Sequence, residues 1–135
     1  MKLVTGRAKI LLMDDEQTIG DLAKEMLSMR GYEVDVTNEG SQAVELYQKA
    51  WKTPDPYDLL ILDLTVPGGM GGKEVIEILG KSDSKIRAIV SSGYSNDPIM
   101  ANYRKHGFTG VVAKPYTVQE LSGAVNQALL MEQTV

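Results

Sequence analysis

Four short apolar runs in this sequence are each followed directly by side chains that carry acids, hydroxyls or an amine. In chain order these side chains are Asp14, Asp15, Glu16, Asp63, Ser91, Ser92 and Lys114. Converging carboxylates repel one another, because two unit charges ~4 Å apart cost ~4 kcal/mol at an effective dielectric constant of about 20. A magnesium ion offsets such repulsion, and it takes a few carboxylates, waters and phosphate oxygens as ligands. A carboxylate nucleophile beside magnesium, an amine and a hydroxyl can accept a phosphoryl group.

Each of these residues, taken singly, has a simpler structural explanation. An aspartate after a strand is often only the N-cap of the next helix. Asp63 is also compatible with a turn, because Pro67 and four glycines follow within nine positions. A lone Lys114 is most simply a solvated surface charge. The combination of these side chains, rather than any one of them, favours phosphoryl chemistry.

The positions of these residues depend on a regular alternation of short apolar runs with longer amphipathic stretches. Strands are predicted over 10–13, 32–36, 59–62, 86–90 and 111–113, and helices over 19–27, 43–51, 74–79, 97–107 and 117–129. Asp97 before Pro98 predicts a capped helix start. Thr117 with Glu120 predicts a capping box. The alternation indicates an α/β fold with a doubly wound, five-stranded parallel sheet, in which ligands bind beyond the carboxyl ends of the strands.

Composition narrows the class of protein further. The chain has 135 residues, of which 43% are apolar, and a net charge of −4, values typical of one soluble domain. We expect a leader over 1–8, the folded domain over 9–130 and a tail over 131–135. The lack of cysteine excludes disulfides and thiolate metal sites, and the single histidine, His106, excludes a paired-histidine site. We expect no nucleic-acid surface, no membrane span, no signal peptide and a cytoplasmic location.

Four segments of the sequence resemble a known family. The segments ILLMDDE, LLILDLTVPGGMGG, IVSSGYS and GVVAKPY, in that order, resemble the receiver domain of two-component response regulators, the CheY-like domain. The resemblance covers roughly residues 7 to 130. The motif sequences are most similar to those of receivers at the C-terminal end of hybrid sensor histidine kinases. It implies a flavodoxin-like (βα)5 fold with strand order 2-1-3-4-5. We therefore expect a domain excised from a longer hybrid kinase rather than a stand-alone shuttle.

The resemblance implies a phosphoacceptor and a metal site. Asp63 would accept a phosphoryl group from a phosphohistidine of a histidine kinase or phosphotransfer domain. Mg²⁺ would be bound directly by Asp15 and Asp63, and largely through water by Asp14. The backbone carbonyl of Thr65, two residues after the acceptor, would supply a further ligand. The only catalysis expected is the domain's own phosphorylation and dephosphorylation.

The resemblance also implies a switch. Lys114 would contact the phosphoryl group, and the Lys114–Pro115 peptide bond would be cis. Ser92, which lies 22 positions before Lys114, would be the switch hydroxyl in preference to Ser91. The acyl phosphate would displace Ser92 and shift the surface of the fourth strand and fourth helix between two arrangements. A homodimer would form through the face made by the fourth helix, fifth strand and fifth helix.

The sequence departs from the family pattern at two places. Many receivers carry an aromatic residue on the fifth strand that rotates with the switch hydroxyl, and Val111 occupies that position here. Tyr94 and Tyr116 are the candidates to replace it. The glycine-rich segment 68–72 is longer by one residue than the common form.

Three alternative functions fit parts of the pattern. A magnesium-dependent phosphohydrolase with an aspartyl-phosphate intermediate would need a second acid two residues after the nucleophile, where this chain has Thr65. A flavin-binding module would need a phosphate-binding loop after the first strand, where Asp14, Asp15 and Glu16 would repel a phosphate. A receiver-like interaction module that is never phosphorylated would not need the full set of site residues that this chain carries.

Overall fold

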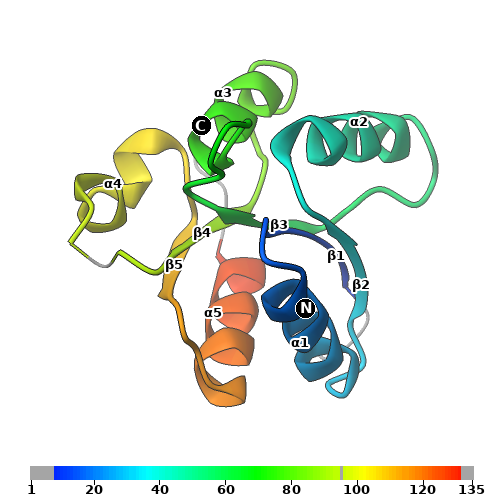
Figure 1. The fold of residues 1–135 in the computed structure, drawn as a ribbon. Helices are drawn as coiled ribbons and strands as arrows, with labels where there is room; N and C mark the ends of the chain where they lie inside the picture. The colour runs from blue at the N-terminus through cyan, green and yellow to red at the C-terminus, as the bar shows by residue number, and fades with distance from the viewer. Residues whose placement is uncertain (1–7, 95, 132–135) are drawn as a thin grey trace.

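The computed structural model describes residues 8–94 and 96–131, which form one parallel sheet with helices on both faces (Figure 1). The strands are β1 (Lys9–Met13), β2 (Glu33–Thr37), β3 (Leu59–Asp63), β4 (Ala88–Ser92) and β5 (Gly110–Ala113), and the helices are α1 (Gln17–Ser28), α2 (Gly40–Trp51), α3 (Gly72–Gly80), α4 (Pro98–Ala101), the 3₁₀ turn η1 (Tyr103–His106) and α5 (Val118–Leu130). The strand order is β2-β1-β3-β4-β5, as predicted. No helix in these described ranges is long and apolar enough to cross a membrane.

The two faces of the sheet are buried in separate apolar layers. Side chains alternate along each strand, so Leu11 and Met13 of β1 pack on one face and Ile10 and Leu12 on the other. In β3 every residue is buried, which explains why this strand is a continuous apolar run up to Asp63. The sheet is therefore a rigid support for whatever its strand ends carry.

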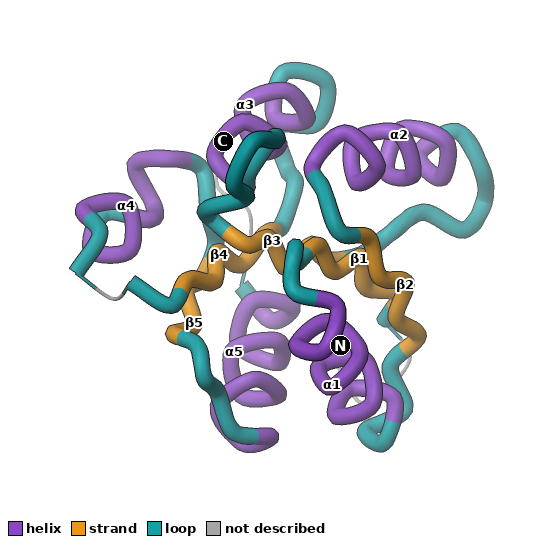
Figure 2. The backbone as a smooth tube through the Cα atoms, viewed as in Figure 1, coloured by secondary structure: helices purple, strands orange, loops and turns teal. Residues whose placement is uncertain are grey.

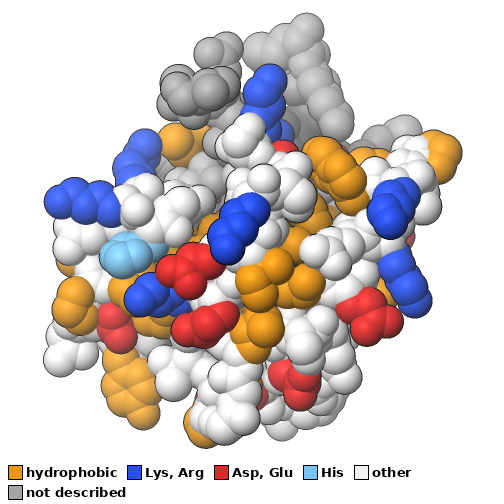
Figure 3. Space-filling view, turned by 90° about the horizontal axis from the view of Figure 1, so that it is seen from above, with side chains coloured by type: hydrophobic (Ala, Val, Ile, Leu, Met, Phe, Trp, Pro, Cys, Tyr) orange, Lys and Arg blue, Asp and Glu red, His pale blue; other side chains and the backbone are white. Residues whose placement is uncertain are grey.

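Each face is covered by helices that are apolar on one side only. Figure 1 shows α1 and α5 below the sheet and α2, α3 and α4 above it, and the tube view in Figure 2 shows the same layers. The lower layer is filled from the helices by Ala23, Leu27, Leu121, Val125 and Ala128. In Figure 3, which is seen from above, positive, negative and apolar side chains are interspersed on the visible face.

Two elements predicted in the second half of the chain have different bounds in the structure. β4 runs to Ser92, because the backbones of Ser91 and Ser92 pair with β5, whereas Ile86 lies in a turn closed on Asp83. Hydrophobicity alone does not reveal such pairing. The helix predicted over 97–107 stops after one turn at Asn102, whose backbone angles, φ −116° and ψ 35°, are not helical. The side-chain amide of Asn102 also donates to the Pro98 carbonyl, at 3.2 Å. A 3₁₀ turn follows and ends at Gly107, which has φ +94°.

The predicted helix starts are confirmed where caps were expected. The carboxylate of Asp97 accepts the amide of Ile99 at 2.9 Å, with Pro98 at the first helical position. Thr117 and Glu120 form the reciprocal capping box that opens α5. The predicted leader and tail lie outside the described residues except for Ala8, which is buried, and Met131.

Close backbone contact ties the start of α2 to the β3–α3 loop. The amide of Gly40 donates to the Met70 carbonyl at 2.9 Å. A Cβ at position 40 would lie 2.5 Å from that carbonyl oxygen and 2.7 Å from the side chain of Val75. Glycine is therefore required here by space, and the contact fixes the loop that begins just after Asp63.

The close contact at Gly40 predicts a stability difference. Gly40→Ala is expected to lower the free energy of unfolding by about 2 kcal/mol, because the β3–α3 loop must move away from the new methyl group. Urea denaturation measures the change.

Gly123→Ala is the matched control for this substitution. No atom lies within 4 Å of a Cβ at position 123, which is inside α5. Alanine is favoured over glycine in a helix interior, so this variant is expected to be more stable by about 0.5–1 kcal/mol. Equal stability of the two variants would contradict the close approach.

Candidate functional site

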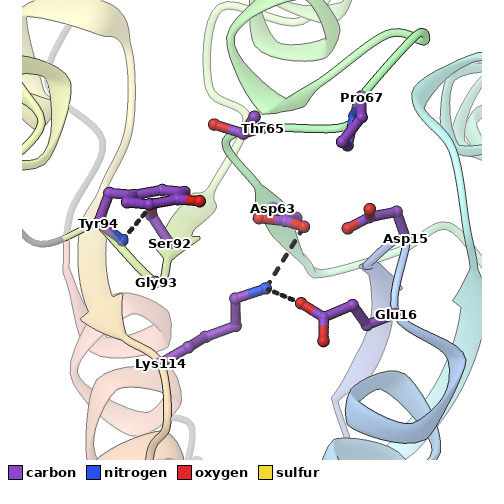
Figure 4. Close-up of a pocket in the computed structure, with 9 residues that line it drawn as sticks. All are labelled: Asp15, Glu16, Asp63, Thr65, Pro67, Ser92, Gly93, Tyr94 and Lys114. Atoms are coloured by element: carbon purple, nitrogen blue, oxygen red, sulfur yellow. Dashed lines mark hydrogen bonds and ion pairs between the residues drawn. The ribbon is translucent and has the colours of Figure 1, made fainter.

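The carboxyl ends of β1, β3, β4 and β5 meet at one edge of the sheet and surround an open cavity of about 330 Å³ (Figure 4). Its lining residues are Asp15, Glu16, Asp63, Thr65, Pro67, Ser92, Gly93, Tyr94 and Lys114. Five of the six predicted site residues line this cavity, and the sixth, Asp14, lies directly behind it. The edge of the sheet thus joins residues from four strand ends.

Lys114 is the centre of the charged cluster. Its ammonium nitrogen lies 3.1 Å from a carboxylate oxygen of Asp14, 3.4 Å from Asp63 and 3.9 Å from Glu16. The side chain of Lys114 is only 8% exposed, and those of Asp14 and Asp63 are 2% and 5% exposed. The backbone holds the lysine in place, because its amide donates to the Ser92 carbonyl at 2.9 Å. The Lys114–Pro115 bond is cis, as predicted.

Negative charge exceeds positive charge at this site. Burial, followed by a hydrogen bond with Asp15, raises the pKa of Asp63 to about 7, although the attraction of Lys114 lowers it. Burial lowers the pKa of Lys114, but attraction by Asp63 and Asp14 outweighs burial, so the pKa is raised and the lysine stays charged. One ammonium group therefore does not fully compensate the carboxylates.

The donor set fits a hard divalent cation. Ligand oxygens of Asp14, Asp15 and Glu16 lie within 4.8 Å of one another, and Asp15 is exposed to the cavity beside Asp63. Asp14 is turned inwards, because its two oxygens accept the Glu16 amide at 2.9 Å and the Lys114 ammonium at 3.1 Å. All-oxygen donors together with uncompensated negative charge are what Mg²⁺ requires.

Ser92 rather than Ser91 lines the cavity, although both are buried. The hydroxyl oxygen of Ser92 accepts the backbone amide of Tyr94 at 2.9 Å. The carbonyl of Ser91 accepts the amide of Leu64, which ties β4 to β3 instead. The position of Ser92 opposite Asp63 allows its hydroxyl to turn towards a group bound on that carboxylate (Figure 4).

The position on β5 that is aromatic in many receivers is occupied by Val111 in this chain. Val111 is partly buried and packs on the apolar layer under α2 and α3. Tyr116 packs on the opposite layer, and burial, followed by the charges of Asp14 and Asp63, raises the pKa of its hydroxyl. Of the two tyrosines considered as replacements, only Tyr94 lines the cavity.

Four cavity residues, Glu16, Pro67, Gly93 and Tyr94, were not among the predicted site residues. Glu16 follows Asp15 directly, and its side chain reaches Lys114. Pro67 and Tyr94 lie on the loops after β3 and β4. Their spacing from Asp63 and Ser92, by four and two positions, was the available signal, but loop conformation is needed to place them.

Comparisons with known proteins agree with this geometry. Residues 10–126 match the model of the response regulator receiver domain. Sporulation initiation phosphotransferase F of Bacillus subtilis (strain 168) is 30% identical over 121 residues, which are 90% of this chain and 93% of that protein. Sensor kinase CckA of Brucella abortus is 27% identical over 126 residues, 93% of this chain but only 13% of that kinase.

A solved structure gives the same result for the fold. The response regulator receiver domain protein from Clostridium thermocellum superimposes with a TM-score of 0.79 at 27% identity, covering 91% of this chain and 94% of that one. The family match extends from β1 into α5 and includes every residue of the cavity. The chain therefore belongs to the response regulator receiver domains of two-component signalling.

Proposed function

We propose that Asp63 is the phosphoacceptor of this receiver domain and takes its phosphoryl group from a phosphohistidine of a histidine kinase or phosphotransfer domain. One observation carries the proposal. Asp63 is a buried carboxylate at the end of a central strand, 3.4 Å from the ammonium group of Lys114, and it faces an open cavity. A carboxylate held in this way is positioned as a nucleophile.

The transfer is a displacement at phosphorus. A carboxylate oxygen of Asp63 forms the new O–P bond, the P–N bond to the donor imidazole breaks, and the electron pair leaves with the imidazole. Lys114 lies beside Asp63 and faces the transferred oxygens, whose negative charge it offsets. Phosphoryl transfer of this kind relies mainly on positioning and electrostatics, which the rigid strand ends supply.

Asp15, Asp63 and the backbone carbonyl of Thr65 would hold Mg²⁺, with Asp14 acting largely through water. The exposed carboxylate of Asp15 and the inward-turned carboxylate of Asp14 support this division. When bound, Mg²⁺ would supply positive charge to the phosphoryl oxygens and to the carboxylate cluster.

Ser92 would couple phosphorylation of Asp63 to a change in the conformation of the surface around α4. Its hydroxyl accepts the Tyr94 amide, so movement of that hydroxyl towards a phosphoryl group alters the turn that leads into α4. α4 has a single turn, and a residue with non-helical backbone angles separates it from η1. These features support a segment that can change its arrangement.

We also propose that the receiver domain spans residues 9–130. A homodimer would form through the face made by α4, β5 and α5. A cleft of about 150 Å³ between η1, β5 and α5 supports this face as a contact surface. Tyr103 and Val111 line it. A module that is never phosphorylated remains the competing function, and labelling of Asp63 separates the two.

Acetyl phosphate tests the acceptor and the metal together. Wild-type protein in MgCl₂ is expected to gain the mass of one phosphoryl group, and EDTA is expected to prevent the gain because the carboxylate cluster then lacks its cation. Asp63→Asn is expected to gain none, since an amide does not displace at phosphorus. Intact-mass spectrometry measures each sample.

Asp21→Asn is the control for loss of an acid, because Asp21 is exposed on α1, outside the cavity. It is expected to be labelled like wild type. Labelling of Asp63→Asn would refute the assignment of the acceptor. Absence of labelling in folded wild-type protein with either acetyl phosphate or a phosphohistidine donor would favour the unphosphorylated module.

Lys114→Ala tests the charge balance. Without divalent cations the variant is expected to lose about 3 kcal/mol of stability, because Asp14 and Asp63 remain buried without their ammonium partner. In MgCl₂ the loss is expected to shrink, since the metal replaces part of the missing positive charge. Urea denaturation with and without MgCl₂ measures both values.

Lys24→Ala is the matched control, because Lys24 is exposed on α1. Its stability is expected to stay within about 0.5 kcal/mol of wild type under both conditions. If magnesium fails to reduce the loss in Lys114→Ala, the ammonium group and the metal do not compensate the same carboxylates.

A further inference from the structure

The cavity has a charged floor and an apolar rim. Asp63, Lys114 and Asp15 lie on or directly after strand ends and suffice to hold a phosphoryl group and its cation. Among the lining residues, only Pro67 and Tyr94 bring a cyclic, largely apolar side chain. Figure 4 shows the Tyr94 ring reaching from the β4–α4 loop into the cavity near Ser92, with Pro67 on the far side of Asp63.

The side chain of Tyr94 has no role in holding the fold. It is 67% exposed, whereas Tyr32, Tyr47 and Tyr57 are all less than a tenth exposed. Within the described part of the chain its hydroxyl has no hydrogen-bond partner and its ring stacks on no other aromatic ring. An aromatic ring left in water beside a reaction cavity is free to contact what enters that cavity.

The backbone of Tyr94, in contrast, is well fixed. Its amide donates to the Ser92 hydroxyl at 2.9 Å, and its carbonyl accepts the amide of Asp97 at 3.1 Å. Asp97 in turn caps α4. The backbone of Tyr94 is therefore fixed at the mouth of the cavity, whereas its side chain is largely exposed.

The geometry of displacement decides what the ring meets. The attacking oxygen of Asp63 comes from the floor, so the leaving group of an in-line transfer points outwards to the mouth. For a phosphohistidine that group is a planar imidazole. Protonation of the distal nitrogen makes the ring cationic before transfer, and it departs neutral, keeping that proton and taking the electron pair of the broken P–N bond. Aromatic faces attract planar rings and cations.

We propose that Tyr94 is a specificity-determining residue that, opposite Pro67, receives the imidazole ring of the phosphohistidine donor and favours it over phosphoryl donors without a ring. This inference rests on the proposed role of Asp63 as phosphoacceptor. It assigns different tasks to the two parts of the cavity: the floor binds the phosphoryl group and the rim recognises what carries it.

Two small donors test the proposal on the full chain. Initial rates of phosphorylation are measured in MgCl₂ with phosphoimidazole and with acetyl phosphate, both below saturation. Tyr94→Ala is expected to lower the phosphoimidazole rate by about 3- to 10-fold and the acetyl phosphate rate by less than about twofold, because only the first leaving group has a ring to stack. The ratio of the two rates is the readout, since a general disturbance of the site lowers both rates alike.

Conservative and distant variants sharpen the comparison. Tyr94→Phe keeps the ring and is expected to keep the wild-type ratio of the two rates. Trp51→Ala removes another exposed aromatic side chain, which lies outside the cavity, and is also expected to keep the wild-type ratio. An unchanged ratio in Tyr94→Ala overturns the role of Tyr94 while leaving Asp63 as acceptor. Failure of both donors to label wild-type protein overturns the acceptor itself, and this proposal with it.

Discussion

The balance between one ammonium group and two buried carboxylates constrains the rest of this structure. Lys114 faces Asp14 and Asp63, and each of the three would be costly to bury alone. They belong to β5, β1 and β3 or the residues directly after them, and β4 lies between β3 and β5. Neighbouring strands are ~4.8 Å apart, so the ammonium group of Lys114 must reach across about 10 Å from β5 to meet Asp63 on β3. Only a long side chain passing over a strand that ends in small residues can do so.

That requirement explains the composition of the β4 end. Ser91, Ser92 and Gly93 are small, which leaves room for the lysine above the strand. The same requirement places a polar hydroxyl, that of Ser92, in the cavity that the carboxylate of Asp63 lines. Space for Lys114 and a hydroxyl in the cavity with Asp63 are thus two results of one packing constraint. The contact of Gly40 with Met70 fixes the neighbouring loop from the other side.

The sequence was sufficient to predict what burial dictates. Continuous apolar runs located β1 and β3, and the polar residues that interrupt those runs had to lie at strand ends, so Asp14, Asp63 and Lys114 were predicted at one edge. Backbone pairing is not encoded in hydrophobicity, and for that reason the extension of β4 through Ser92 was missed. α4 ends because the backbone of Asn102 leaves the helical conformation, which no periodic pattern reveals.

The cavity residues that were not among the predicted site residues share a location. Pro67 and Tyr94 lie on loops, where side-chain direction follows from turn geometry rather than from periodicity. Glu16 lies at the start of α1 and is exposed, so its approach to Lys114 depends on a flexible side chain. The difference has a physical origin: the strand ends are determined by a buried core and carry charges that must be compensated, whereas Pro67 and Tyr94 carry no charge and their rings are not part of the core. Residues that contact a varying partner belong where the core does not dictate their identity, and in this chain that place is the rim of the cavity.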